Sequence, residues 1–229
     1  MHLPTFFASC EKRETKRHAV CRPTVSHRIF YAERNGNFLE FYRELTAKDG
    51  RTLILRHAEA ADAAAYLQYF LTAHKETDFL TTYPEEATAD EDTVAVRIAE
   101  TAKAPDAIEL CALIDGRLIG SAGIACVRRR EKTAHRASFG ISILREYWGI
   151  GIGSALTEAC MSLAQEAGYL QIELEVVSEN ERAVHLYRRF GFTEYGRNPK
   201  AFRTRDGRWQ ELIYMRKELG DADTVLAGS

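Results

Sequence analysis

A glycine-rich turn between an apolar run and an amphipathic segment constrains the fold of this chain more than any other feature. Residues 141–156 read ISILREYWGIGIGSAL, in which glycines alternate at Gly149, Gly151 and Gly153. Glycine is needed where the backbone itself must come close to a ligand. A turn that leads into a helix presents free N–H groups, and the helix dipole favours negative charge there. The pattern therefore indicates a strand, a turn and a helix that bind a phosphate or diphosphate, with a purely structural tight turn as the alternative.

The bulk composition limits the classes of protein that the chain can be. Its 229 residues are 45% hydrophobic and carry a formal net charge of −2. This suits one substantial core, and it lacks the basic excess typical of proteins that bind nucleic acid or anionic membranes, so we expect neither as partner. No apolar run reaches the roughly 18 residues of a membrane-spanning helix. The five cysteines show no C-x-x-C spacing, so we expect no metal site and reduced thiols in a cytoplasmic protein.

The amino-terminal segment differs in composition from the rest of the chain. The first 36 residues contain seven Lys/Arg, three Asp/Glu and three of the seven histidines. They lack a sustained apolar period and the long apolar segment of a signal peptide. We expect residues 1–38 to be a poorly ordered basic arm, residues 39–219 to be the folded domain and residues 220–229 to be a tail. A basic tethering segment and a translation start near Phe38 are the alternatives for the arm.

Turn signals and hydrophobic periodicity predict a mixed α/β domain. Strands are expected at 51–57, 108–114, 118–127, 134–144, 172–176, 192–196 and 211–216, and helices at 59–73, 91–102, after the glycine turn as far as Gly168, and at 180–190. Asp115-Gly116 suits a type I′ hairpin turn between two of these strands. Because strands and helices do not alternate strictly, we predict a mixed central β-sheet flanked by helices.

The last predicted helix carries two residues that suit a binding site. Asn180 stands at the expected N-cap, where its side chain can satisfy backbone N–H groups or contact a ligand. Tyr187 lies about two turns further along the same face. Taken singly, Asn180 is an ordinary helix cap and Tyr187 an ordinary core aromatic. Their order and spacing after the glycine turn make them informative together.

These motifs together resemble the GCN5-related N-acetyltransferase (GNAT) family. The loop pattern of that family, Gln/Arg-x-x-Gly-x-Gly/Ala, reads WGIGIG over residues 148–153, with Trp148 at the Gln/Arg position. The pattern of the family's last helix is matched by Asn180, Ala183, Tyr187, Gly191 and Phe192. The resemblance covers roughly residues 45–218 and implies a GNAT-like acyl-CoA transferase fold.

The resemblance implies direct transfer of the acetyl group of acetyl-CoA, as co-substrate and without a metal, to a primary amine of a small molecule or protein. The backbone of Ile141, Ser142 and Ile143 would pair with the pantetheine arm, and the Ile143 N–H would polarise the thioester carbonyl. The diphosphate would be held by Gly149, Ile150, Gly151, Ile152, Gly153 and Ser154, with Asn180 as a further cofactor contact. Tyr187 would donate a proton to the departing thiolate. The fold also allows a homodimer.

The chain departs from the family pattern at the expected general base. Family members often carry a glutamate on the strand before the loop, whereas Ser138 occupies that place here. A serine hydroxyl is too weak a base at neutral pH, so we expect another carboxylate to act through water.

The acceptor site is expected in the connecting segments 78–86, 128–135 and 198–209. The carboxylates of Asp78, Glu85 and Glu86 in the first of these segments would attract a cationic amine. The alternative is that they are solvated loop charges.

Two other functions compete with acetyl transfer. A dinucleotide-binding oxidoreductase requires the spacing G-x-G-x-x-G/A, but Ser154 or Leu156 falls where the third small residue belongs. A non-catalytic CoA-binding sensor or interaction module of the same fold is the second alternative, and the missing glutamate favours it.

Overall fold

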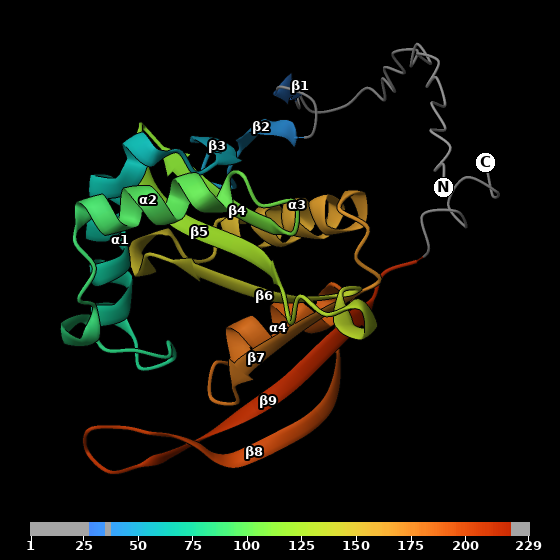
Figure 1. Ribbon diagram of the computed structural model, residues 1–229. Helices are drawn as coiled ribbons and strands as arrows, with labels where there is room; N and C mark the ends of the chain where they lie inside the picture. The colour runs from blue at the N-terminus through green and yellow to red at the C-terminus, as the bar shows by residue number, and fades with distance from the viewer. Residues whose placement is uncertain (1–27, 35–37, 221–229) are drawn as a thin grey trace, which may run out of the picture.

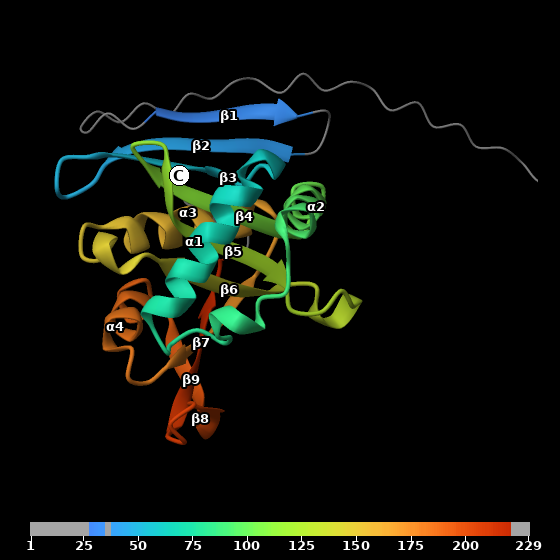
Figure 2. The same cartoon turned by 90° about the vertical axis from the view of Figure 1, so that its left-hand side faces the viewer.

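A single mixed β-sheet organises the part of the chain that the computed structural model describes, residues 28–34 and 38–220. Its nine strands lie in the order β1-β2-β3-β4-β5-β6-β7-β9-β8 (Figures 1 and 2). Neighbouring strands are antiparallel, except for the parallel pair β6 and β7. The strands are β1 Arg28–Arg34, β2 Phe38–Thr46, β3 Thr52–His57, β4 Ala107–Ile114, β5 Arg117–Cys126, β6 Arg136–Ile143, β7 Gln171–Val177, β8 Thr193–Arg203 and β9 Trp209–Glu218.

The helices cover the sheet and connect its strands. The α-helices of the described residues are α1 Ala63–Glu76, α2 Glu91–Thr101, α3 Ile152–Glu166 and α4 Glu181–Arg189. Figure 2 shows α1 crossing in front of the sheet, while α3 lies on its far side. The amphipathic segment predicted after the glycine turn forms α3, and its apolar residues Leu156, Cys160 and Leu163 are buried against the strands. From β3 onward the order of strands and helices is the one predicted. No helix among the described residues is long and apolar enough to cross a membrane.

The sheet extends beyond the predicted domain at its amino-terminal edge. Residues 28–38 were expected in the basic arm, but the structure has β1 at Arg28–Arg34 and starts β2 at Phe38. Residues 1–27 of the predicted arm lie outside the described residues. Antiparallel pairing with β2 gives β1 its backbone hydrogen-bond partners.

The closing hairpin is longer than expected. The segment 198–209 was predicted to be a polar connection, yet β8 runs as far as Arg203 and only a short turn separates it from β9. The side chains of β8 are exposed or only partly buried on both faces of the strand. A strand that buries neither face needs no apolar alternation, so the hydrophobic pattern understates its length.

The parallel strands β6 and β7 separate near the glycine turn. Only Arg136–Ser138 of β6 pair with Gln171–Glu173 of β7, and the strands part after these residues (Figure 1). On its other side β6 stays bonded to β5 along its whole length, from Arg136 to the Leu144 N–H, which donates to the Ile119 carbonyl at 2.9 Å. The even-numbered residues of β6 therefore direct their backbone groups to β5. The N–H and C=O groups of Ile141 and Ile143 face the opposite edge, where β7 has moved away.

Candidate active site

The glycine turn lies beside the opening between β6 and β7. Gly149 and Gly151 have φ angles of +85° and +100°, a region that glycine adopts without strain. Gly151 is the N-cap of α3, and no side chain of the described residues caps this helix. The first intrahelical bond is made by the Ala155 N–H to the Gly151 carbonyl, at 3.1 Å. The preceding N–H groups of α3 are thus available to an anion.

A cavity of about 270 Å³ adjoins this turn, and we call it the glycine-turn cavity. Its walls contain nearly all residues that were predicted to bind the cofactor: Ile141, Ser142, Ile143, Gly149, Gly151, Ile152, Gly153, Ser154 and Asn180. Ile150 is not among them; its carbonyl oxygen accepts a 3.0 Å hydrogen bond from the Lys48 N–H. The cationic side chains of Lys48, Arg182 and Arg189 also line this cavity, together with one carboxylate, Glu76, which accepts a 2.7 Å hydrogen bond from the Arg145 N–H. Positive charge and free N–H groups together suit a phosphorylated ligand.

The backbone edge of β6 faces the same cavity. The Ile143 carbonyl oxygen accepts a 2.7 Å hydrogen bond from Trp148 Nε1. The guanidinium groups of Arg145 and Arg182 lie 5.5 and 4.9 Å from the Trp148 ring, within the range of cation–π contacts. Ser142 is directed differently, because its carbonyl oxygen accepts a 2.8 Å hydrogen bond from the Tyr69 hydroxyl. Ile141 and Ile143 therefore provide the exposed backbone edge.

Tyr187 is a buried residue that lines the glycine-turn cavity. Its ring contacts those of Phe139 and Phe192 edge to face, with centroids 6.2 and 5.8 Å away. The Tyr187 hydroxyl makes no hydrogen bond to the described residues. Burial raises the pKa of this hydroxyl, so it keeps its proton at neutral pH. A buried, protonated and unpaired hydroxyl can donate a proton to a ligand.

Asn180 is the N-cap of α4, as predicted. Its Oδ1 accepts a 3.2 Å hydrogen bond from the Ala183 N–H, while its Nδ2 makes no hydrogen bond within the described part of the chain. The cap fixes the position of the amide, and the Nδ2 donors are left for a ligand.

A second cavity joins the first at Tyr187. The residues common to both are Phe79, Leu80, Ile141, Asn180 and Tyr187. Its wall is otherwise mainly apolar and includes two carboxylates, from Glu173 and Glu175 on β7. Among the described residues that line it there is no Lys, Arg or His. We call it the carboxylate cavity, since the two adjoining cavities differ in the sign of their charge.

The two carboxylates differ in their surroundings. Glu173 is buried, accepts a 2.7 Å bond from Arg136 Nη2 and also a 2.6 Å bond from Gln171 Nε2. The hydrogen bonds from Arg136 lower the pKa of Glu173, although burial opposes them. Glu175 is exposed to the cavity and makes no hydrogen bond or ion pair with the described residues. Glu175 is therefore the carboxylate that a ligand can reach.

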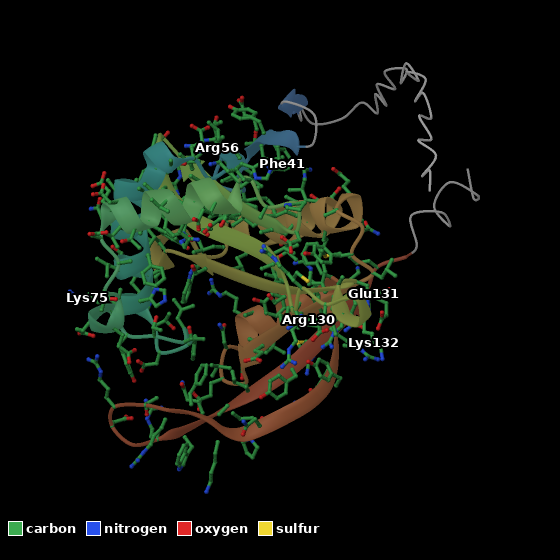
Figure 3. All side chains as sticks on the ribbon, in the orientation of Figure 1. Phe41, Arg56, Lys75, Arg130, Glu131 and Lys132 are labelled. Carbon is green, nitrogen blue, oxygen red and sulfur yellow. The ribbon has the colours of Figure 1, made fainter. Side chains whose placement is uncertain are left out.

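The residues predicted to form the acceptor site are only partly there. Segment 78–86 contributes Phe79, Leu80 and Thr81 to the carboxylate cavity, and segment 198–209 contributes Phe202. Segment 128–135 lines neither cavity, and Figure 3 shows Arg130, Glu131 and Lys132 on the outer surface of the molecule.

The carboxylates predicted to attract the amine do not line the cavities. Asp78, Glu85 and Glu86 are absent from both walls. Glu85 pairs with Arg205, and Glu86 accepts the Tyr83 N–H at 2.7 Å. Their place is taken by Glu173 and Glu175, which the sequence reasoning missed although the alternation in QIELEVV puts both on one strand face.

Ser138 lies in the wall of the carboxylate cavity, at the position expected for the general base. Its Oγ donates a 3.2 Å hydrogen bond to the Ala125 carbonyl oxygen. The hydroxyl is thus engaged with the backbone of β5. No group of three His, Cys, Asp or Glu in residues 28–34 and 38–220 is arranged to hold a metal ion.

Comparison with known proteins identifies relatives of the chain. Residues 67–192 match the sequence model of the acetyltransferase (GNAT) family. The L-amino acid N-acetyltransferase AaaT of Escherichia coli (strain K12) is 28% identical over 165 residues, which cover 71% of this chain and 96% of that protein.

Solved structures share the fold. The acetyltransferase of the GNAT family from Streptococcus pneumoniae has 27% identity and a TM-score of 0.70, over 73% of this chain and 99% of its own. The phosphinothricin acetyltransferase from Sinorhizobium meliloti, solved in complex with AcCoA, has 24% identity and a TM-score of 0.65, over 78% of this chain and 92% of its own. The predicted fold class is thereby confirmed.

Proposed function

Because the chain belongs to the acetyltransferase (GNAT) family and is an acetyl-CoA-dependent N-acetyltransferase, we propose that its acceptor is a small primary amine without a carboxylate of its own. Acetyl-CoA binds in the glycine-turn cavity and the amine in the carboxylate cavity. The observation that carries this proposal is the opposite charge of the two cavities that meet at Tyr187. One suits the phosphates of coenzyme A, and the other suits an ammonium group.

Several groups of the glycine-turn cavity fit coenzyme A. The N–H groups of Ile152, Gly153 and Ser154 point from the start of α3 and suit the diphosphate, with Lys48 and Arg182 as counter-charges. Little space is left for side chains here, since a Cβ on Gly153 would lie 3.3 Å from Leu186 Cδ2. The exposed backbone edge of β6 suits the amides of the pantetheine arm.

The proposed reaction uses two groups of the chain at the thioester. When bound, acetyl-CoA supplies an acetyl group that the amine nitrogen can attack, and the carbon–sulfur bond breaks as the carbon–nitrogen bond forms. The Ile143 N–H stabilises negative charge on the carbonyl oxygen. Tyr187 gives its proton to the departing sulfur and recovers one from solvent.

The incoming amine must also lose its proton. Ser138 is too weak a base, and its hydroxyl already donates to Ala125. Glu175 is an accessible carboxylate in the same cavity wall, so we assign to it the attraction of the ammonium group and removal of its proton through water. Glu173 is less suited because Arg136 and Gln171 already bind its oxygens.

The charge of the carboxylate cavity limits the acceptor. The Escherichia coli relative is an L-amino acid N-acetyltransferase, whose acceptor carries a carboxylate next to the amine. In this chain such a group would face Glu175, which makes no ion pair with the described residues, and none of the described residues in the cavity wall is a Lys, Arg or His that could bind the carboxylate. Repulsion between like charges therefore favours an amine without that carboxylate.

We further propose that the protein is cytoplasmic. The described cysteines, Cys111, Cys126 and Cys160, are free thiols, which agrees with the reducing cytoplasm. A homodimer stays a prediction from the fold.

Two acceptors that differ only in the carboxylate test the proposal. We expect kcat/KM for phenethylamine to exceed that for L-phenylalanine at least tenfold at pH 8, which corresponds to about 1.4 kcal/mol. The Glu175→Gln variant should lose activity with phenethylamine. The ratio of kcat/KM for phenethylamine to kcat/KM for L-phenylalanine should therefore be smaller in this variant than in the wild-type enzyme. Equal or better use of phenylalanine by the wild-type enzyme would contradict the acceptor assignment, and unchanged kinetics of Glu175→Gln would remove Glu175 from it.

A further inference from the structure

Two distant segments of the chain hold each other beside the carboxylate cavity. The guanidinium carbon of Arg205, in the turn between β8 and β9, lies 3.9 Å from the centre of the Tyr83 ring. Arg205 Nη2 is 2.6 Å from Glu85 Oε2. The backbone N–H of Arg205 donates a 3.1 Å hydrogen bond to the Tyr83 hydroxyl. Tyr83 and Glu85 belong to the loop between α1 and α2. We call this set of three contacts the clasp.

The clasp joins the ends of two walls of the carboxylate cavity. On one side, Thr81 lines the cavity and Tyr83 follows two residues later. On the other side, Phe202 lines it and Arg205 follows three residues later. The clasp thus ties the α1–α2 loop to the β8–β9 turn close to residues of both segments that line the cavity. Figure 1 shows this loop and the β8–β9 turn at the same end of the molecule.

We propose that Arg205, through its contacts with Tyr83 and Glu85, restricts the acceptor to small molecules and excludes amines carried on a peptide. This inference rests on the proposed function, since it names the size of the amine that the carboxylate cavity admits. A small amine can be held within the carboxylate cavity. The rest of a peptide would extend past the segments that line the cavity, and the clasp holds two of these segments together. Arg205 acts as a specificity-determining residue and does not take part in the chemistry.

The clasp is held by contacts that can be removed without unfolding the domain. The side chains of Arg205 and Glu85 are 58% and 67% exposed, so their ion pair is largely solvated. Loss of the Arg205 side chain removes the ion pair and the ring contact and leaves only the bond from the Arg205 backbone N–H to Tyr83, which should loosen the loop from the turn and leave the sheet intact. Loops that border a site on a rigid scaffold commonly set which ligands enter.

A pair of acceptors with the same amine tests the inference. Phenylalaninamide and a five-residue peptide amide that begins with phenylalanine share the amine, the side chain and the adjacent amide, and differ only in length. For the wild-type enzyme we expect kcat/KM to be at least tenfold higher for phenylalaninamide. In Arg205→Ala the ratio should fall below threefold, chiefly through a lower KM for the peptide, while kcat with phenylalaninamide is unchanged. Arg203→Ala is the matched control, because Arg203 contacts Trp209 instead of the loop, and it should keep the wild-type ratio.

The outcomes separate this inference from the function beneath it. Equal use of amide and peptide by the wild-type enzyme, or an unchanged ratio in Arg205→Ala, would overturn the role of Arg205 and leave the acetyltransferase assignment standing. Acetyl transfer to neither of these acceptors nor to phenethylamine would instead overturn the proposed acceptor class, and the size restriction with it.

Discussion

The indole Nε1 of Trp148 donates a 2.7 Å hydrogen bond to the carbonyl oxygen of Ile143. This bond ties the segment before the glycine turn to the exposed edge of β6. It occupies one of the two backbone groups that Ile143 presents to the glycine-turn cavity and leaves the N–H for a ligand. Trp148, at the position where the family usually has Gln or Arg, therefore orders the backbone that we expect to bind pantetheine.

Substitution of Trp148 by phenylalanine tests this ordering. An aromatic ring near Arg145 and Arg182 is kept, but the hydrogen-bond donor is lost. A typical net contribution of about 1 kcal/mol for one such bond predicts a roughly fivefold higher Kd for acetyl-CoA, measurable by calorimetry. Trp209→Phe is the control, since Trp209 lines neither cavity and should bind as the wild type does. Unchanged affinity of Trp148→Phe would show that the bond does not order the site.

The proposed acid is tested by removal of one hydroxyl. In Tyr187→Phe we expect kcat to fall about 100-fold, the usual scale for loss of an acid–base group, with little change in acetyl-CoA affinity. Since burial raises the pKa of Tyr187, its acid form persists and the wild-type rate should not decline between pH 7 and about pH 9.5. Near-normal turnover of the variant would exclude this role.

A second buried tyrosine provides the control for Tyr187→Phe. The Tyr169 hydroxyl donates a 2.6 Å hydrogen bond to the Asp106 carbonyl and lies outside both cavities. Tyr169→Phe should lower the free energy of unfolding but leave kcat unchanged. A fall in kcat of similar size in both variants would point to a structural effect.

The pair of Arg136 and Glu173 should make stability depend on pH. The pKa of Glu173 is lowered in the folded state, chiefly by hydrogen bonds from Arg136. Its stabilisation is therefore full above the unfolded pKa of about 4.3 and is lost as pH falls through the lower folded value. Glu173→Gln should reduce the free energy of unfolding by about 1–3 kcal/mol at pH 7, and the difference should shrink at pH 3. A difference that is equal at both pH values in urea denaturation would contradict this account.

Local sequence signals were sufficient for the elements that carry the cofactor site. The positive φ angles of Gly149 and Gly151 require glycine, and Asn180 caps α4 through its own side chain. Each of these features depends on residues that are close together in the sequence, so the sequence pattern indicates it. For the same reason the buried stripe of α3 could be read from its period. The site roles of these residues stay predictions until ligand binding is measured.

Pairing between distant segments accounts for what the sequence did not reveal. The approach of Ser138 to Glu173 depends on the parallel register of β6 and β7, which no turn specifies. In the sequence alone, Glu173 and Glu175 look like ordinary charged residues of a strand. Only the register of β6 and β7 shows that both line a cavity. Similarly, Arg205 and Glu85 meet across 120 residues of sequence.

The hairpin of β1 and β2 was overlooked for a different reason, because its signal is local: Asn35-Gly36 between two apolar runs is typical of a hairpin turn.

The central claim is that the glycine turn forms the acetyl-CoA site, and calorimetry with acetyl-CoA on three proteins tests it most directly. Gly151→Val places a branched side chain at φ +100° beside the cavity, whereas Gly168→Val imposes a similar conformational strain at φ +84°, outside both cavities. The account predicts micromolar binding by the wild-type chain and by Gly168→Val, and none by a folded Gly151→Val. Retained binding by Gly151→Val, or no binding by the folded wild-type chain, would contradict it.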